Sequence, residues 1–405
     1  MLQAFFHAWE RRLASVTTDR VVRPFEWGLE WIPQGGHPDQ SPSDALRSWV
    51  SHVMSDTDAF FTPAPTSDYH FAPAADGGGL LTFPSALVTP HSDNNTVRCR
   101  FFPARAGPWP RECKQRPGPW AREFEQRPGP WPREFEQRPG PGPREFKQRP
   151  GPGPREFKQR PGMGPRKGKQ RPAVLVMPQW NADAAGHVGL CRLLAWNGMS
   201  ALRLSLPYHD QRMPPELHRA DYIVSANLAR TVQVCRQAVL DARRAIAWLA
   251  SQGYDPIGIL GTSLGSCLAL LTTAHEPLIR AEALNHISPQ FADVVWRGLS
   301  TRHVREGLEG HIELDLLRAL WKPISPQSYL ERLRDRQTLL VYARYDLTFP
   351  VDLSEDLVRA FREGGIPHDV AVLRCGHYST GKMPFKFVDG WVLVRFLKKA
   401  LLRSA

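Results

Sequence analysis

Short apolar runs recur along the chain, and helical patterns separate the later ones. The runs predict eight strands, at residues 79–87, 95–102, 173–179, 200–207, 257–263, 282–288, 337–345 and 368–375. Helical spacing of apolar residues is found in segments 184–196, 227–252, 264–274 and 385–402. Apolar strands separated by helices predict an α/β fold with a mainly parallel sheet and helices on both of its faces. In such a fold, functional residues are expected at the carboxyl ends of the strands.

Residues 1–78 precede the first predicted strand, and we interpret them as a helical extension packed on the main domain, residues 79–405. Phe5, Trp9 and Leu13 recur at helical spacing, which favours a face packed on the domain over a membrane anchor. The N-terminus lacks the apolar core of a signal peptide, and no run reaches the roughly 20 apolar residues of a membrane span. The sequence therefore predicts a cytoplasmic protein without a transmembrane segment.

An eleven-residue phrase repeats six times between residues 107 and 172. The segment holds 16 of the 38 prolines, and proline removes backbone donors and clashes with helical geometry. We therefore expect a disordered insertion in a loop between strands 95–102 and 173–179, as two neighbouring strands of one domain. A recently expanded DNA repeat is the favoured explanation, and the alternative is an arm that binds an anionic or protein partner.

The net charge of +12 is concentrated in this repeat. Residues 107–172 contain 17 Lys and Arg against 7 Glu, so they carry +10 of the total. Because the rest of the chain is nearly neutral, the basic composition does not indicate a nucleic-acid partner. The six cysteines occur singly, without the spacing of metal ligands, so we expect reduced, structural thiols and neither a metal nor a cofactor.

The segment Gly261-Thr262-Ser263-Leu264-Gly265 follows a predicted strand and opens a predicted helix. In that position, the pattern G-x-S-x-G is typical of a nucleophile elbow, in which a serine occupies a strained turn. The flanking glycines allow the strand and the helix to pack closely around the serine. Ser263 is therefore the predicted nucleophile.

A nucleophilic serine needs a base and an acid, which in this architecture follow it in the order Ser, Asp or Glu, His. Asp346 comes just after the strand 337–345, and His377 comes just after the strand 368–375. Both the order and the positions at strand ends match this requirement. We predict that His377 is the general base and that Asp346 orients it.

The oxyanion that forms during acyl transfer needs two hydrogen-bond donors. One is predicted to be the backbone amide of Leu264, which follows the nucleophile. The other is predicted in the loop after strand 173–179, at the amide of Gln179 or Trp180.

The segment GHYSTGKM, residues 376–383, offers a competing interpretation as a phosphate-binding loop. It contains G-x-x-x-x-G-K but has Met383 where the motif needs a Ser or Thr for Mg²⁺. It also follows the last predicted strand, whereas a phosphate loop usually opens an early strand–helix unit. A turn that presents His377 is therefore the favoured interpretation.

The elbow, the acid and the base resemble those of the α/β-hydrolase superfamily, over roughly residues 80–402 without the repeat. Within it, the segments LSLPYHDQRMP and AVLDARRAIAWLASQGYDPIGILGTSLGS resemble the α/β-hydrolase domain-containing protein 18-like group. The resemblance implies a carboxylic-ester hydrolase that acts on a small-molecule acyl ester with Ser263, Asp346 and His377. It specifies neither an acyl chain nor an oligomeric state, because this fold carries many activities. The alternative is a catalytically silent scaffold whose basic repeat binds a partner.

Residues 289–326 lie between two strands on the catalytic side, and we interpret them as a small cap. The candidate pocket residues are Trp296, Leu299, Leu308 and Trp321 in this segment, with Tyr208 in the loop after strand 200–207. The side chains of the cap segment equally suit the cap's own core. His286 and His303 are predicted to have structural hydrogen-bonding roles.

Overall fold

The computed structural model of the protein describes residues 2–33, 40–75, 77–105 and 170–402. These residues fall within one compact unit, and a second unit, residues 109–169, lies outside the described part of the chain. The predicted disordered repeat therefore lies outside the described residues, except for residues 170–172.

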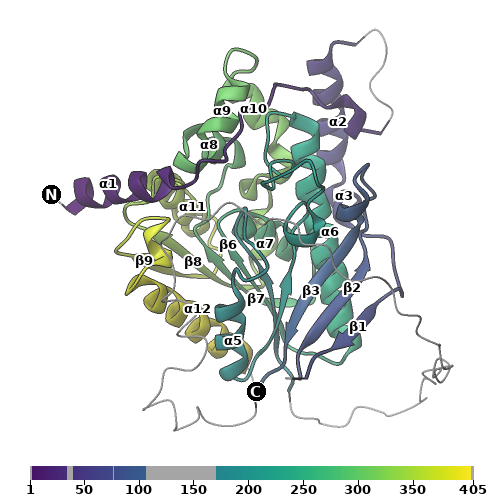
Figure 1. Ribbon diagram of the computed structural model, residues 1–405, viewed down its shortest axis with the longest axis vertical. Helices are drawn as coiled ribbons and strands as arrows, with labels where there is room; N and C mark the ends of the chain where they lie inside the picture. Colours follow the sequence, from purple (N-terminus) through teal and green to yellow (C-terminus); the bar gives the residue numbers. More distant parts are fainter. Residues whose placement is uncertain (1, 34–39, 76, 106–169, 403–405) are drawn as a thin grey trace, which may run out of the picture. The chain divides into compact units, whose positions relative to one another are not determined.

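The strands form one nine-stranded sheet in the order β1-β2-β3-β5-β4-β6-β7-β8-β9. Figure 1 shows this sheet, with β1 to β3 at one end and β8 and β9 at the other. Their bounds are β1 (His70–Pro73), β2 (Gly79–Pro84), β3 (Thr96–Phe102), β4 (Ala173–Met177), β5 (Ser200–Leu204), β6 (Ile257–Thr262), β7 (Ile279–Asn285), β8 (Gln337–Ala343) and β9 (His368–Leu373). Strands β5, β4, β6, β7, β8 and β9 each pair in parallel with their neighbours in this series. At the other end of the sheet, β1, β2 and β3 pair antiparallel with one another in sequence, and β3 pairs antiparallel with β5. The predicted mainly parallel sheet is confirmed.

The sheet has one strand more than the eight that the sequence predicts. The extra strand is β1, which lies within the range 1–78 that was expected to be helical. All four of its residues are exposed, so no buried face gives it the alternating pattern by which strands are recognised. A second difference concerns the strands that flank the repeat: β3 and β4 are consecutive among the described strands, but β5 lies between them in the sheet.

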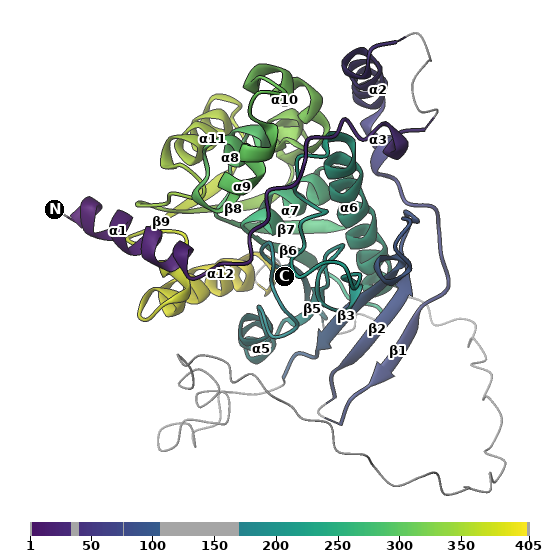
Figure 2. The ribbon, with the colours of Figure 1, turned by 45° about the horizontal axis from the view of Figure 1, so that its top comes forward.

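The longer helices cover both faces of the sheet (Figure 2). Their bounds are α1 (Leu2–Ser15), α2 (Pro42–Ser55), α3 (Thr57–Phe61), α5 (Val188–Trp196), α6 (Leu228–Ser251), α7 (Leu264–His275), α8 (Phe291–Arg297), α9 (Arg302–Leu308), α10 (Leu314–Leu320), α11 (Val351–Glu363) and α12 (Phe385–Leu402). Helices α6, α7 and α11 contribute to one hydrophobic core, and α5 and α12 contribute to the other. Within the described part of the chain, no helix is long and apolar enough to cross a membrane.

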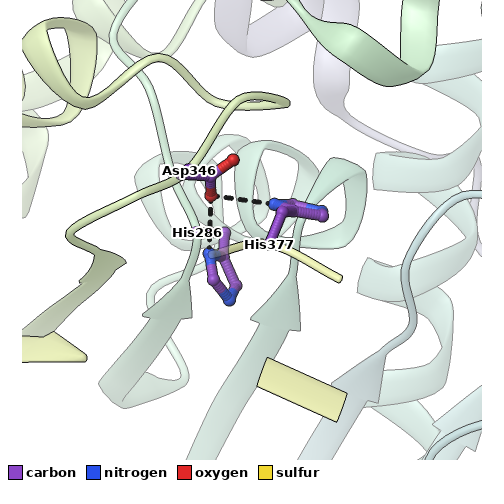
Figure 3. A group of neighbouring side chains, drawn as sticks. All are labelled: His286, Asp346 and His377. Carbon is purple, nitrogen blue, oxygen red and sulfur yellow. Dashed lines mark hydrogen bonds and ion pairs between the residues drawn. The ribbon is translucent and has the colours of Figure 1, made fainter. Parts of the chain in front are cut away.

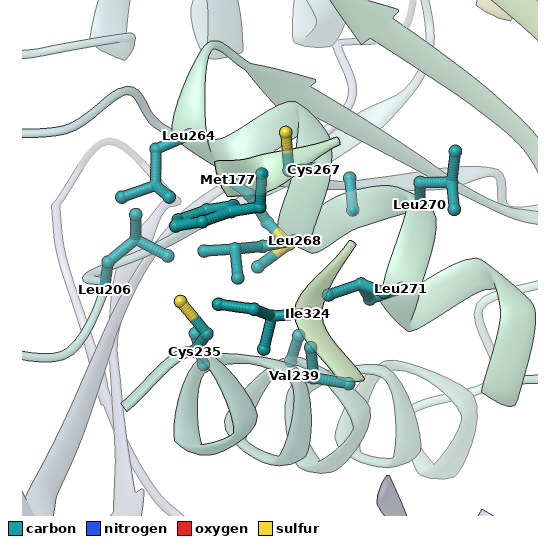
Figure 4. Close-up of a cluster of buried hydrophobic side chains, with 14 of the residues drawn as sticks. Met177, Leu206, Cys235, Val239, Leu264, Cys267, Leu268, Leu270, Leu271 and Ile324 are labelled. Carbon is teal, nitrogen blue, oxygen red and sulfur yellow. The ribbon is translucent and has the colours of Figure 1, made fainter. Parts of the chain in front are cut away.

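Strand β4 shows how the sheet separates the two cores. All five of its residues are buried, and successive side chains point to opposite faces of the sheet. Leu175 and Met177 belong to the core of α6 and α7, whereas Val174 and Val176 belong to the core of α5 and α12. Figure 4 shows Met177 in the first core, together with Leu268 of α7. Full burial of such a side chain stabilises the fold by about 1.5–3 kcal/mol.

Helix α1 packs on the rest of the domain through a face that overlaps only in part with the one that its apolar spacing predicts. Its buried residues are Phe6, Glu10 and Ala14, whereas Phe5 is 61% exposed. Trp9 and Leu13 of the predicted stripe are half-buried, and Trp9 packs against the core of α5 and α12. Glu10 is fully buried, and a charged side chain is buried only where it finds hydrogen-bond partners.

Candidate active site

The three residues of the predicted triad lie at the carboxyl ends of three parallel strands. Ser263 follows β6 directly, Asp346 follows β8, and His377 follows β9. The Oγ atom of Ser263 lies 3.1 Å from Nε2 of His377, and Nδ1 of His377 lies 2.9 Å from Oδ2 of Asp346. Figure 3 shows the last of these hydrogen bonds. The structure thus joins a hydroxyl, an imidazole and a carboxylate in one continuous hydrogen-bonded chain.

The turn that carries Ser263 has the features of an elbow. Ser263 has a φ of 56° and a ψ of −122°, a conformation that costs a residue other than glycine about 1–3 kcal/mol. A Cβ atom at Gly261 would lie 2.2 Å from the carbonyl oxygen of Gly265, and a Cβ atom at Gly265 would lie 2.3 Å from that of Met177. Only glycine fits at these two positions, so the spacing of the motif follows from close backbone contact.

Asp346 accepts hydrogen bonds through both of its carboxylate oxygens. Its Oδ1 accepts from the amides of Thr348 and Phe349, each at 2.8 Å. Its Oδ2 accepts from Nδ1 of His377 and from Nδ1 of His286, each at 2.9 Å. Burial alone would raise the pKa of Asp346, but the charge of His377 and the hydrogen bonds from both histidines lower this pKa well below its usual range. The carboxylate is therefore ionised at every pH at which the protein is expected to work.

His377 lies between Asp346 and the hydroxyl of Ser263 and is hydrogen-bonded to both. Burial alone would lower the pKa of His377, but the charge and the hydrogen bond of Asp346, with a further contribution from Glu10, raise this pKa above its ordinary value. The ring stacks on Phe349 with a centroid distance of 5.4 Å and an interplanar angle of 3°. Because Nδ1 donates to a carboxylate, Nε2 has the lone pair that can accept the proton of Ser263.

His286 is a second histidine on Asp346, beyond the general structural role that the sequence suggested (Figure 3). It follows β7 directly, has a φ of 57° and is 2% exposed. Burial and the neighbouring charge of His377 lower the pKa of His286, so its ring is neutral and its Nδ1 proton is donated to Asp346. The signal that points to it in the sequence is its position at the carboxyl end of a strand next to that of Ser263.

His286, Asp346 and His377 also form a group whose potential ligand atoms lie within 4.8 Å of one another. A metal would need both histidine nitrogens without their protons, at about 2.0–2.1 Å from the ion. Each Nδ1 atom instead lies 2.9 Å from Oδ2 of Asp346, the distance of a hydrogen bond. The distances between these three side chains are therefore those of hydrogen bonds and not those of ligands around one metal ion.

The predicted oxyanion groups lie on two neighbouring segments. Leu264 is the first residue of α7, and Gln179 and Trp180 follow the end of β4. The close contact of Gly265 with the carbonyl oxygen of Met177 brings the start of α7 against the end of β4. These amides stay the predicted donors.

His209 fixes the loop that contains Gln179 and Trp180. Its Nε2 accepts the amide of Asn181 at 2.9 Å, and its Nδ1 donates to the carbonyl oxygen of Pro207 at 2.8 Å. Burial lowers the pKa of His209 to about 4, so the ring stays neutral and Nε2 can accept a hydrogen bond. Its neighbour Tyr208 was a candidate pocket residue, but no pattern in the sequence indicated a role for His209.

The candidate pocket residues differ in burial. Tyr208, Leu308 and Trp321 have no exposed surface, and the polar atoms of Tyr208 and Trp321 have hydrogen-bond partners. Leu299 is buried, and Trp296 is half-buried. A groove of about 870 Å³ lies between α5 and α12, and none of these residues lines it. Contact of these five side chains with substrate stays a prediction.

Segment 376–383 forms a turn and a short 3-10 helix between β9 and α12. The amides of Tyr378 and Ser379 donate to the carboxylate of Glu10, at 2.8 and 2.9 Å. A phosphate loop holds its anion with backbone amides of this kind, but here a protein carboxylate already uses them. The geometry favours the loop of a base over a nucleotide site.

No protein-family model and no curated protein matches this sequence. The acetyl xylan esterase from Paenibacillus sp. R4 has a similar solved structure, with 13% identity and a TM-score of 0.52 over 94% of this chain and 100% of the esterase. Acetyl xylan esterase 1 from Thermoanaerobacterium sp. JW/SL YS485 has 10% identity and a TM-score of 0.54 over 89% of this chain and 99% of its own. A third match, Pyrococcus horikoshii acylaminoacyl peptidase, has 14% identity and a TM-score of 0.46, and the matched region is only 38% of that protein. The chain thus has an α/β-hydrolase-like fold with a mostly parallel, nine-stranded sheet.

Proposed function

We propose that the protein is a serine hydrolase that cleaves a carboxylic ester, or a related acyl bond, through an acyl-enzyme intermediate. The observation that carries the proposal is the hydrogen-bonded chain from Ser263 through His377 to Asp346, with the serine on a strained turn. Two proteins with a similar fold are acetyl xylan esterases, which supports an ester as substrate. The sequence resemblance to the α/β-hydrolase domain-containing protein 18-like group agrees with the same chemistry.

In the first half of the reaction, Nε2 of His377 takes the proton of Ser263 while Oγ attacks the carbonyl carbon of the ester. The negative charge moves to the carbonyl oxygen, where the amide of Leu264 and an amide at Gln179 or Trp180 stabilise it. The imidazolium of His377 then gives its proton to the leaving alcohol. The C–O bond breaks, and an acyl-serine remains.

In the second half, His377 takes a proton from water, whose oxygen attacks the acyl-serine. The collapse of this intermediate returns the proton to Oγ of Ser263 and releases a carboxylic acid. Asp346 stays ionised throughout and stabilises the imidazolium that forms in each half. The lowered pKa of Asp346 keeps this carboxylate ionised while it does so.

Labelling with a fluorophosphonate probe tests the proposal directly. The probe is expected to attach to Ser263, located by mass spectrometry, and short p-nitrophenyl esters are expected to be hydrolysed. A panel of such esters with increasing acyl length then reports the size of the pocket. A folded protein that neither takes up the probe nor hydrolyses any ester would contradict the proposal.

The value of kcat/KM is expected to rise with increasing pH, with a midpoint above the ordinary histidine pKa of about 6.5. His377 accepts a proton only when neutral, and Asp346 and Glu10 raise its pKa, so activity is lost as pH falls through this raised value. Initial rates with p-nitrophenyl acetate from pH 5 to pH 9 measure the midpoint. A midpoint below about 6 would exclude His377 in this environment as the base.

Replacement of His286 tests its share in orienting Asp346. His286→Leu removes an N–H donor to a charged oxygen, which is worth about 1.5–3 kcal/mol, so kcat is expected to fall by about tenfold or more. The acid limb of the pH profile is expected to move to higher pH. Asp346 then accepts one hydrogen bond fewer, so its negative charge acts more strongly on His377 and raises the pKa of His377 further.

His286→Asn is the matched control, since an Asn amide offers an N–H donor near the position of Nδ1. It is expected to retain most of the activity and the wild-type acid limb. Equal rates and equal pH profiles in the Asn and Leu variants would remove the hydrogen bond to Asp346 from the mechanism.

A further inference from the structure

Helix α1 contacts both loops that carry the predicted acid and base. Phe6 stacks on Tyr345, the residue before Asp346, with a centroid distance of 4.6 Å and an interplanar angle of 8°. One turn further along α1, Glu10 binds the loop that follows His377. The two loops also bind each other, because the amide of Tyr345 donates to the carbonyl oxygen of Cys375 at 3.0 Å. A helix at the N-terminal end of the chain thus holds elements that are more than 300 residues away.

The Glu10 contact is specific to a carboxylate. Its Oε2 accepts the amide of Tyr378 at 2.8 Å, and its Oε1 accepts the amide of Ser379 at 2.9 Å. Two acceptor oxygens on one side chain are what two adjacent backbone donors require. Glu10 has no exposed surface, and a buried carboxylate is tolerated only with such partners.

The loop is shaped to receive this side chain. A Cβ atom at Gly376 would lie 2.4 Å from Cδ of Glu10, so any residue other than glycine would push the carboxylate away. A third contact comes from the segment after α1, where Arg20 donates to the hydroxyl of Tyr378 at 3.1 Å. The close fit at Gly376 ties the position of His377, the next residue, to the position of α1.

We infer that Glu10 is a positioning residue for the general base: by binding the two amides that follow His377, it fixes the distance from this imidazole to Ser263. The inference rests on the proposed hydrolase function. It assigns helix α1, which lies before the first strand in the chain, a part in holding the general base. Small displacements of a catalytic group are costly, since about 1 Å can lower a rate by about 100-fold.

Glu10 also acts on His377 through its charge. Asp346 and Glu10 raise the pKa of His377, whereas the neutral ring of His286 only packs against the ring of His377, with a centroid distance of 4.6 Å. Loss of the charge at position 10 is therefore expected to lower this pKa and to move the acid limb of kcat/KM to lower pH. A residue with only a packing role would not move the acid limb in this direction.

The test compares two substitutions that separate charge from reach. Glu10→Gln keeps the length but offers one acceptor to two donors, so kcat is expected to fall about tenfold with little change in KM, and the acid limb moves to lower pH. Glu10→Asp keeps the charge but is one methylene shorter, so kcat falls while the acid limb stays near its wild-type position. Arg11→Gln, an exposed change of one charge on the same helix, is the control and keeps wild-type values.

Thermal unfolding and NMR titration of 15N-labelled histidines accompany the kinetics. The titration reads the pKa of His377 without turnover, so a lower pKa in Glu10→Gln supports the inference even if no substrate is hydrolysed. Failure of the hydrolase proposal appears instead as wild-type protein without probe labelling. A wild-type kcat together with an unchanged pKa of His377 in Glu10→Gln would overturn the inference. It would also be overturned if Glu10→Gln and Glu10→Asp lost kcat equally and the loss were fully explained by the smaller folded fraction that a lower Tm indicates.

Discussion

Replacement of Ser263 by alanine is expected to lower kcat for p-nitrophenyl esters by about 10⁴-fold or more, and to abolish fluorophosphonate labelling. The variant has no oxygen to attack the carbonyl carbon, so His377 and Asp346 have no nucleophile to activate. The fold is expected to persist, because alanine fills the same turn with one atom fewer and keeps the backbone amide of Ser263 that donates to Asn285 at 2.7 Å.

Ser51→Ala is the control for labelling. Ser51 is an exposed serine on α2, and its substitution is expected to leave the attachment of the probe at Ser263 intact. Steady-state kinetics, probe labelling and circular dichroism are measured on all three proteins. An alanine variant at 263 that keeps the label, or more than a tenth of the wild-type rate, would assign the nucleophile to another residue.

Replacement of Asp346 by asparagine is expected to lower kcat by about 10³- to 10⁴-fold. The four N–H groups that now face two carboxylate oxygens would face one oxygen and one NH₂ group. His377 then loses both the acceptor that selects its tautomer and the charge that raises its pKa, so the residual activity is expected to titrate at lower pH. Buried donors left unpaired cost about 1–3 kcal/mol each, so Tm is expected to fall as well.

Rates corrected for the folded fraction separate the catalytic loss from the loss of stability. Asp352→Asn, which changes an exposed carboxylate at the start of α11, is the control and is expected to keep wild-type kcat. A rate for Asp346→Asn within tenfold of wild type would mean that a different carboxylate orients His377.

The order of chemical groups along the chain made much of this site predictable. Ser263, Asp346 and His377 each follow an apolar strand, and the carboxyl ends of parallel strands meet at one edge, so a local pattern was enough to predict their convergence. The glycines at 261 and 265 add a steric requirement that is visible in five consecutive residues. Both signals are short-range, which is why a single sequence contains them.

Contacts between distant segments were not predictable in the same way. Glu10 and Ser379 are 369 residues apart, and nothing local to either residue indicates the other. For His286, the only signal in the sequence was its place after a strand. Its role depends on Asp346, whose Oδ2 atom accepts hydrogen bonds from both His286 and His377. Strand β1 was missed since its four residues are all exposed, and strand recognition relies on a buried face.

The sheet topology also fixes where the repeat is attached. Phe102 at the end of β3 pairs with Ala201, and Ala173 at the start of β4 pairs with Ser200, so both attachment points lie at the amino ends of the parallel strands. Ser263 lies at the opposite, carboxyl edge, one strand length of roughly 17 Å away. A change in the number of eleven-residue copies therefore alters the chain between two residues at the amino edge of the sheet, and leaves the order of Ser263, Asp346 and His377 along the chain unchanged.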